Sequence, residues 1–277
     1  MPSSPRTGSS VSGPTRRNGM EKRVDRDWWK SLFDDLYLIT DSRSVCDEGL
    51  TRKEVDLILE LTGASKEWRI LDLCGGQGRH ALELARRGFC SVTVLDYSES
   101  LVSLGKEAAR KEGISIHFVR GDARNTGLSD DSFDAVFILG NSFGYFLEED
   151  DDRKVLSEAY RLLIPGGVFL LDVSSGDYVR ENFRPLAWHE IGDDIVVCRE
   201  REMRGDRVVT REVVLSKREG LLRDACYSIR LFGEEELNAI AREAGFRHIQ
   251  TLSGLAFHEK KGDYGFMNSR IYLLGRK

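Results

Sequence analysis

The sequence predicts an α/β fold: a doubly wound, mostly parallel seven-stranded sheet that carries a small antiparallel β insertion. Short apolar strands alternate with helical segments between residues 69 and 173, which is the rhythm of right-handed βαβ units. These strands are apolar almost throughout, as in a sheet covered on both faces. Between residues 178 and 230 the pattern changes to alternating strands separated by tight turns, which is typical of an antiparallel sheet.

Two amphipathic helices are expected before the first strand. Residues 27–40 and 50–62 place apolar side chains three and four positions apart, so that they share one face of a helix. The strands of the main sheet are expected at residues 69–73, 91–96, 114–120, 133–139, 167–173, 248–252 and 269–274. Its helices are expected at residues 80–87, 98–112, 152–163 and 233–244, with Ser98 as an N-cap and Gly245 as a stop signal.

Composition and charge exclude several classes of protein. Apolar residues make up 40% of the 277 residues, which is enough for a packed core. The longest uncharged stretch, residues 135–147, is shorter than the ~20 residues that a membrane-spanning helix needs, so no membrane partner is expected. The net charge of −5 argues against nucleic acid as a partner. Five cysteines without metal-binding or disulfide spacing predict reduced thiols, a cytoplasmic location and no metal site.

A glycine-rich loop follows the first strand of the main sheet. Residues 71–81, LDLCGGQGRHA, lead from that strand into a helix, and Asp96 ends the next strand. Such a loop lets a ligand approach the backbone, and an acid at the position of Asp96 can accept hydrogen bonds from ribose hydroxyls. The pattern predicts a nucleotide-like ligand. Because Gly76, Gly78 and Ala81 also fit the dinucleotide spacing, a nicotinamide cofactor is an alternative.

Asp72 distinguishes between the two kinds of ligand. It lies at the end of the strand just before the loop, close to the place where a nicotinamide cofactor puts its pyrophosphate. A buried carboxylate would repel that group and attract an ammonium instead. S-adenosylmethionine (SAM) carries an ammonium, a carboxylate, a sulfonium and an adenosine but no phosphate, so SAM is the predicted cofactor.

Several segments together resemble the class I SAM-dependent methyltransferases, especially bacterial small-molecule enzymes of mostly unassigned substrate. Two departures from the family pattern are Cys74, in place of the usual first glycine, and Ile164, in place of a lysine. The likeness covers roughly residues 65–175 and 231–277. The segments that carry it are residues 71–78, 95–96, 121–123, 163–167 and 231–246.

The resemblance implies a cofactor site at the carboxyl ends of the strands. Asp72 should meet the ammonium of SAM, Asp96 its ribose and Asp122 its adenine, while Tyr37 in the first helix folds over the cofactor. Together the residues expected to bind the cofactor are Tyr37, Asp72, Gly75, Gly76, Gly78, Arg79, Asp96, Tyr97, Gly121, Asp122, Ala123, Leu139 and Gly140.

Catalytic residues are harder to predict, since methyl transfer needs a base only when the acceptor is protonated. Tyr145 follows the fourth strand and is expected to contact the sulfonium or the acceptor. His189, at the start of the inserted sheet, and His258, before the last strand, are the candidate bases.

The chain is expected to divide into four parts. Residues 1–24, rich in Ser, Gly, Pro and Arg, predict a disordered tail. Residues 25–177 form the SAM-binding α/β domain, residues 178–230 an antiparallel lid over the substrate, and residues 231–277 complete the α/β domain.

The predicted activity is transfer of a methyl group from SAM to O or N of a small-molecule acceptor. An NAD(P)-dependent oxidoreductase and a SAM-binding module without catalysis are the alternatives. A DNA base methyltransferase is disfavoured by the acidic charge and by Asn141-Ser-Phe-Gly144, which stands where such enzymes carry an N-P-P-Y-type loop. The oligomeric state stays open.

Overall fold

The computed structural model describes residues 23–255 and 268–277. Of the tail predicted as disordered, residues 1–22 lie outside this part of the chain, as does the candidate base His258.

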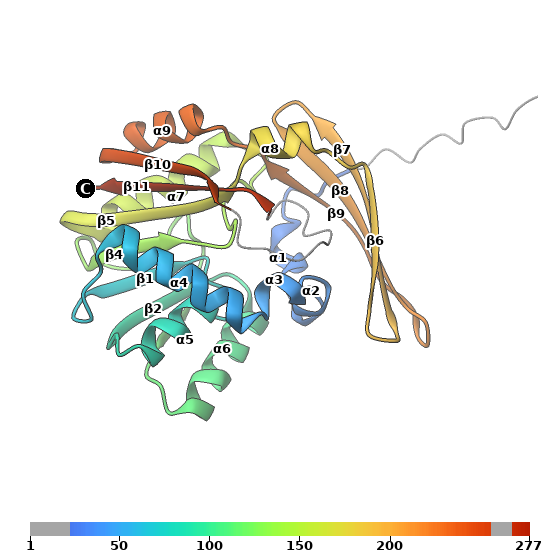
Figure 1. Cartoon of the computed structure of the whole chain (residues 1–277), viewed down its shortest axis with the longest axis horizontal. Helices are drawn as coiled ribbons and strands as arrows, with labels where there is room; N and C mark the ends of the chain where they lie inside the picture. The colour runs from blue at the N-terminus through green and yellow to red at the C-terminus, as the bar shows by residue number, and fades with distance from the viewer. Residues whose placement is uncertain (1–22, 256–267) are drawn as a thin grey trace, which may run out of the picture.

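Seven strands form the main sheet, in the order β10-β11-β5-β4-β1-β2-β3 (Figure 1). Every neighbouring pair is parallel except those of β11, which runs antiparallel to both β5 and β10. The predicted fold class is therefore confirmed. The strands are β1 (Arg69–Leu73), β2 (Ser91–Asp96), β3 (His117–Arg120), β4 (Phe133–Ile138), β5 (Leu163–Ser174), β10 (Arg247–Leu255) and β11 (Arg270–Arg276).

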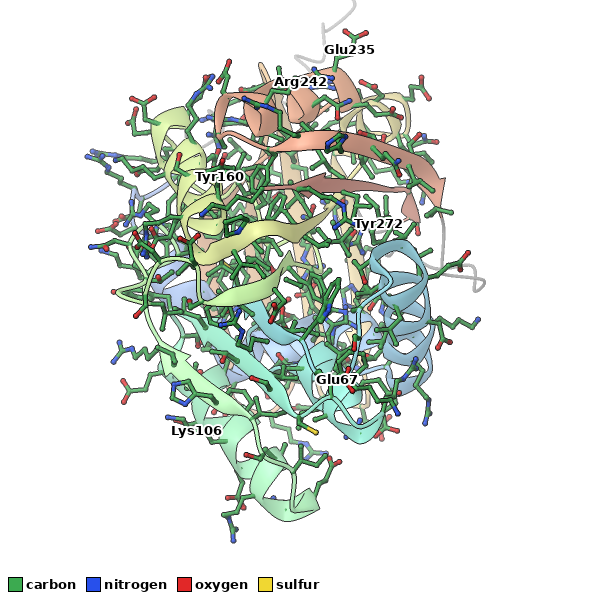
Figure 2. All side chains as sticks on the ribbon, turned by 90° about the vertical axis from the view of Figure 1, so that its left-hand side faces the viewer. Glu67, Lys106, Tyr160, Glu235, Arg242 and Tyr272 are labelled. Atoms are coloured by element: carbon green, nitrogen blue, oxygen red, sulfur yellow. The ribbon has the colours of Figure 1, made fainter. Side chains whose placement is uncertain are left out.

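Helices cover both faces of this sheet. One apolar cluster joins it to α4 (Glu48–Thr62), α5 (Arg79–Arg86) and α6 (Glu99–Glu112), and a second joins it to α7 (Glu149–Leu162) and α9 (Glu234–Glu243). Figure 2 shows the layers from the side, with Tyr272 inside and the side chains of Lys106 on α6 and Glu235 on α9 at the periphery. The continuous apolar strands thus reflect burial from two sides.

A second, four-stranded antiparallel sheet stands beside the carboxyl ends of the parallel strands (Figure 1). It follows α8 (Gly176–Glu181), a short helix that the sequence pattern did not predict. Its strands, in spatial as well as chain order, are β6 (Leu186–Ile191), β7 (Ile195–Arg204), β8 (Arg207–Ser216) and β9 (Gly220–Arg230).

The single helix predicted for residues 27–40 is wrong. Instead there are three short helices: α1 (Trp29–Leu32), α2 (Asp35–Thr40) and α3 (Ser42–Val45). The break has a local cause, because the Asp34 carboxylate accepts a hydrogen bond from the Tyr37 N–H at 3.0 Å and starts a new helix. A second difference is β5, which begins at Leu163 rather than at residue 167.

The three short helices are held between the two sheets (Figure 1). On the side of the main sheet, Ser98 Oγ donates a hydrogen bond to the Phe33 carbonyl at 2.5 Å and Gln77 Nε2 donates to the Val45 carbonyl at 3.0 Å. On the other side, Arg199 Nη2 of β7 lies 2.8 Å from Asp41 Oδ2. These contacts fix the helices as the wall that joins the two sheets.

Candidate functional site

One pocket lies where the main sheet, the three short helices and the antiparallel sheet meet. All the residues expected to bind the cofactor line it, except Gly78, and Tyr145 lines it as well. Much of the remaining lining comes from α1–α3, from the turn after β4 and from one face of β7–β9.

Gly78 does not face the pocket, so the expected direct contact with the cofactor is not supported at this residue. Its N–H already donates to the Gly75 carbonyl at 2.8 Å. A Cβ added to Gly78 would lie 2.9 Å from the Phe118 ring and 3.2 Å from Val94, on the side of the sheet. Gly78 therefore lets α5 pack closely on β2 and β3, and its φ of 73° favours glycine as well.

The loop is shaped around the carboxylate of Asp72. A Cβ placed on Gly75 would lie 2.6 Å from the carboxyl carbon of Asp72, so only glycine fits there. Cys74, at a position where the methyltransferases that the sequence resembles usually have glycine, adopts a φ of 61°, a conformation that costs an L-residue roughly 1–2 kcal/mol. Burial, together with the neighbouring acids, raises the pKa of the Cys74 thiol well above its usual value, so the thiol stays protonated.

Asp72 is a buried acid whose carboxylate has no hydrogen-bond partner among the described residues. Its exposed fraction is 1%, yet it lines the pocket. Burial raises the pKa of Asp72 to about 7; Arg79 opposes this shift and Asp96 adds to it. An unpaired buried carboxylate is costly, and a cation placed in the pocket would remove that cost.

Asp96 ends β2 and is held by the backbone around it. Its Oδ2 accepts the Gly76 N–H and its Oδ1 accepts the Ser98 N–H, both at 2.8 Å. Each carboxylate oxygen can accept a further hydrogen bond, so the group can still bind two neighbouring hydroxyls. The side chain is oriented in advance, because its position does not depend on the ligand.

Asp122 lines the pocket but is already engaged by Arg124. The Arg124 N–H and guanidinium donate to it at 2.9 Å and 2.6 Å, and the same guanidinium donates to Asp151 at 2.7 Å. Arg124 also lies over the rings of Trp29 and Phe146, at 5.2 Å and 4.5 Å from their centroids. This end of the pocket is thus a fixed polar and aromatic surface, suited to a flat base.

The turn after β4 is fixed by Asp172 of β5. Asp172 Oδ2 accepts the Gly140 N–H at 3.1 Å, and its backbone carbonyl accepts the Asn141 N–H at 3.1 Å. Asn141 Oδ1 in turn accepts the Ser174 N–H at 2.8 Å, which stabilises the left-handed backbone of Asn141 at φ 64°. Burial raises the pKa of Asp172 to about 6, against the effect of the adjoining Arg270 guanidinium.

Behind the glycine loop lies a buried network centred on Glu54 of α4. Glu54 pairs with Arg79, accepts from His80 at 2.9 Å and lies 3.9 Å from the Arg270 guanidinium. Burial would raise the pKa of Glu54, but Arg79 and His80 hold it below its usual range. Burial and Arg79 also lower the pKa of His80 to about 4, so His80 is neutral at physiological pH and shapes the loop.

Aromatic rings from three elements enclose the far side of the pocket. Tyr145 stacks on Phe33 at 5.3 Å between ring centroids and meets Trp28 edge-on at 5.4 Å, while Tyr37 packs on Phe33 at 5.1 Å. Burial raises the pKa values of Tyr37 and Tyr145, so both phenols stay protonated at physiological pH. The structure supports a role in covering the pocket for Tyr37 and Tyr145, and it gives neither residue the character of a base.

His189 of β6 is not among the residues that line the pocket. It lies opposite Val197 in the sheet register and near Thr40 and Arg43, toward the far end of the short helices. Burial, with the charges of Arg43 and Arg199, lowers its pKa. The sequence pattern predicted that His189 lies on a strand of the inserted sheet. It did not show how far along that strand His189 lies from the pocket.

Four polar residues of the antiparallel sheet line the pocket and were not predicted: Arg199 and Arg201 of β7, Glu212 of β8 and Tyr227 of β9. Arg199 donates to Glu212 and to Asp41, both at 2.8 Å. The sequence does show that Arg199 and Arg201, two positions apart, share one face of their strand. It does not show which face turns toward the pocket, because that depends on tertiary packing.

In residues 23–255 and 268–277, no group of three or more His, Cys, Asp or Glu side chains is arranged to hold a metal ion. Within the same part of the chain, no helix has the length and apolar character needed to span a membrane.

Comparison with known proteins connects this site to a family. A family profile described as "Methyltransferase domain" matches residues 70–167. A glycine/sarcosine N-methyltransferase from Aphanothece halophytica is 35% identical over 130 residues, which are 46% of this chain and 49% of that protein. The C-methyltransferase UbiE of ubiquinone/menaquinone biosynthesis from Bartonella tribocorum is 40% identical over 111 residues, 39% of this chain and 41% of that protein.

The fold has close counterparts among solved structures. A SAM-dependent methyltransferase from Clostridium acetobutylicum matches with a TM-score of 0.69 at 19% identity, over 87% of this chain and 96% of that one. The chain spans about half the length of the curated relatives it matches, whereas the structural match covers 87% of this chain.

Proposed function

Because residues 70–167 form a methyltransferase domain of the class I SAM-dependent family, as the sequence motifs predicted, we propose that the protein transfers a methyl group from SAM to O or N of a small molecule. The observation that supports this best is the carboxylate of Asp72, which is buried in the pocket wall beside the glycine loop and has no hydrogen-bond partner within residues 23–255 and 268–277. It suits the ammonium of SAM and would repel a pyrophosphate.

Different residues of the pocket bind different parts of the cofactor. Asp72 and the turn at Gly140 hold the amino-acid end, Asp96 binds the ribose, and the surface around Asp122 and Arg124 faces the base. Bound SAM would supply a methyl carbon that bonds to the acceptor atom as its bond to sulfur breaks in line, with S-adenosylhomocysteine as the leaving group.

The described residues then contribute orientation and exclusion of water. Trp28, Phe33, Tyr37 and Tyr145 enclose the reacting region with apolar surface. Alignment of two reactants in a closed site contributes up to roughly 7–11 kcal/mol to lowering a barrier. Since the buried tyrosines stay protonated, the acceptor is best supplied as a neutral amine or as an already ionised group.

The segment of residues 178–230, which contains the antiparallel sheet, is the proposed substrate lid. Its inner face supplies Arg199, Arg201, Glu212 and Tyr227 to the pocket wall. The two curated relatives methylate different elements by their names, nitrogen in one and carbon in the other. In this proposal, residues outside the matched domain of residues 70–167 therefore determine which acceptor is methylated.

The test is a transfer experiment with methyl-labelled SAM. The protein is incubated with labelled SAM and a fractionated small-molecule extract, and labelled products are identified by mass spectrometry. The proposal expects a labelled O- or N-methyl product that disappears when Asp96 or Asp72 is replaced. Label on a carbon atom would overturn the choice of acceptor atom. Clear SAM binding with no transfer to any fraction would favour the SAM-binding module without catalysis.

A mutation at Asp96 tests the cofactor geometry separately. Asp96→Ala removes the carboxylate that two backbone N–H groups orient toward the pocket. We expect binding of S-adenosylhomocysteine (SAH), the product form of the cofactor, to weaken by about 1–3 kcal/mol, measured by calorimetry. Unchanged affinity in a variant with a normal circular dichroism spectrum would show that Asp96 does not bind the ribose.

The proposal includes a cytoplasmic location and disfavours a nicotinamide cofactor. A cytoplasmic location accords with five cysteines of which none forms a disulfide bond among the described residues. The nicotinamide-dependent alternative would need the pocket to accept a diphosphate next to Asp72.

A further inference from the structure

We infer that a cavity on the outer face of the antiparallel sheet, the face turned away from the cofactor pocket, binds a phosphate group, either free or carried by a small organic molecule. This arginine cavity has a volume of about 490 Å³, and its polar lining consists of Arg23, Arg204, Arg207 and Ser228. None of the described residues that line it also lines the cofactor pocket, so the inference does not depend on the proposed function.

The arginine cavity and the cofactor pocket lie on opposite faces of β9. Tyr227 and Ile229 line the cofactor pocket, whereas Ser228 between them lines the arginine cavity. Successive side chains of a strand point to opposite faces of the sheet, so Ser228 points away from the cofactor. A ligand held by Ser228 would therefore bind outside the cofactor pocket.

Three arginines stand directly opposite one another across the outer face. Arg204 of β7 is in register with Arg207 of β8, and Arg207 is in register with Arg230 of β9. Opposite side chains on neighbouring antiparallel strands have Cβ atoms roughly 4.5–5.5 Å apart, and like charges in such pairs are destabilising. An anion bound beside this row would offset the repulsion.

The first and third arginines of the row have acids beside them. Arg204 Nη2 lies 2.9 Å from Glu202 Oε2. Arg230 lies 2.7 Å from Asp152 Oδ2 and 2.9 Å from Asp206 Oδ2. These acids are not part of the cavity wall, since no acid is among the described residues that line it. The polar lining is therefore cationic, with a hydroxyl beside it.

Arg207, the central arginine of the row, has a guanidinium nitrogen that is not used. Its Nη2 donates to the carbonyls of Phe146 and Leu147, whereas its Nη1 is buried and has no hydrogen-bond partner in the described part of the chain. Burial and the charge of Arg230 lower the pKa of Arg207, against the effect of the nearby acids. The fold thus stabilises this positive charge less well than water does, and a bound anion would compensate for the difference.

Ser228 supplies a second unused donor at the same cavity. It is 1% exposed, and within residues 23–255 and 268–277 its hydroxyl has no hydrogen-bond partner. Val209 lies opposite Ser228 in the sheet register, and Arg207 is two positions from Val209, so Arg207 and Ser228 are diagonal neighbours on one face. A buried donor without an acceptor costs free energy, which a ligand oxygen placed between the two side chains would recover.

A phosphate suits these donors better than a carboxylate. It carries a charge of about −1.5 to −2 at pH 7 and three strongly accepting oxygens, whereas a carboxylate has one charge and two oxygens in a plane. Its tetrahedral oxygens can accept from Arg207 of β8, from Ser228 of β9 and from Arg23 at the same time. The rest of the lining is apolar and suits the organic part of a phosphate ester: Val24, Leu147 and Val209.

Three probes test which anionic group the cavity selects. Phenyl phosphate, inorganic phosphate and benzoate are each titrated by calorimetry into the ligand-free, full-length protein at pH 7.5 and constant ionic strength. We expect phenyl phosphate to bind at least about tenfold more tightly than benzoate, which has the same ring and a smaller charge. Inorganic phosphate that binds as tightly as phenyl phosphate would identify the free ion as the ligand, and weaker binding of inorganic phosphate would identify an ester.

Variants assign the binding to the arginine cavity. Arg207→Met should weaken phenyl phosphate binding at least about 20-fold, and Ser228→Ala should weaken it about threefold to fivefold. Ser228→Ala removes a hydroxyl that has no partner in the described chain, so it should fold normally even if Arg207→Met, which also loses the carbonyl contacts, does not. Arg211→Met is the matched control, because Arg211 shares the strand face of Arg207 but pairs with Asp224 outside the cavity. The control should leave the affinity unchanged.

Several results would overturn the phosphate site. They are benzoate binding as tightly as phenyl phosphate, no detectable binding of either phosphate, and phenyl phosphate binding that is unchanged in both Ser228→Ala and Arg207→Met. Added SAH should leave the affinity for phenyl phosphate unchanged, and displacement by SAH would place the probe in the cofactor pocket and refute the inference. The heat of the SAH titration alone reports on the proposed function, so the failure of one is distinguished from the failure of the other.

Discussion

Asp72→Asn is expected to weaken SAH binding about 100-fold while making the ligand-free protein more stable at pH 8. The weaker binding and the higher stability have the same physical cause. The wild-type carboxylate is buried with no hydrogen-bond partner in the described part of the ligand-free chain, and it gains a partner when the ammonium of the ligand arrives. The variant loses that attraction and no longer contains the buried charge.

The pH dependence follows from the raised pKa of Asp72. In the folded, ligand-free protein burial raises it to about 7, whereas the unfolded chain has its ordinary value of 3.8. Between these two pKa values the folded protein keeps Asp72 protonated while the unfolded chain has lost that proton. The destabilisation caused by the buried charge is therefore absent below about pH 4 and complete above about pH 7. Wild-type SAH affinity should fall as the pH drops below 7, because the ammonium needs the ionised form.

Urea unfolding and calorimetry check both parts of this prediction. At pH 8 the ligand-free variant should be about 1–2 kcal/mol more stable than the wild type, since the gain from removing the charge exceeds the cost of a buried amide. The difference should shrink at pH 5.5. Asp134→Asn is the control: Asp134 lies on β4 and pairs with Arg69, so its removal should leave SAH binding unchanged. A destabilised Asp72→Asn that binds SAH normally would contradict the assignment.

Arg270→Met is expected to destabilise the fold by about 3–5 kcal/mol at pH 8. Arg270 is 1% exposed, contacts the Asp172 carboxylate and lies 3.9 Å from Glu54. Without it, both acids remain buried with less compensating charge. Because Asp172 also accepts the Gly140 N–H, the turn after β4 should loosen and SAH binding should weaken.

A partial rescue by acid distinguishes this mechanism from simple loss of packing. Removing Arg270 raises the pKa of Asp172 above its present value of about 6, so the carboxyl becomes protonated as the pH falls from 8 to 6 and the penalty is lost. The deficit measured by urea unfolding should therefore be smaller at pH 6. The control is Arg276→Met, an exposed position on the same strand. A deficit below about 1 kcal/mol, or one that does not change with pH, would refute the role given to Arg270.

The part of the site that the sequence predicted well is local. The glycine loop, Asp72 and Asp96 lie within a single βαβ unit, where the order of elements alone brings strand ends and helix N-terminus to one edge. The burial of Asp72 followed from its place at the end of an apolar strand. The family likeness then supplied the turn at Gly121, which the structure also brings to the pocket.

The part that the sequence could not predict depends on contacts between distant segments. Arg199 meets Asp41 across more than a hundred residues of chain, and nothing in the local pattern of either segment points to the other. The break at Asp34 shows the reverse case, in which one side-chain cap outweighed an amphipathic repeat. His189 does not line the pocket. An alternating strand pattern shows which side chains share a face of the strand, but not where along the sheet they lie.

The central claim is that the pocket is charged to receive an ammonium and a ribose rather than a diphosphate. The most direct measurement is a calorimetric titration of the wild-type protein with SAH and, in parallel, with NADH at pH 7.5. The account predicts a saturable signal with SAH, lost in Asp72→Asn, and no binding of NADH. Tight binding of NADH with no heat from SAH would contradict it.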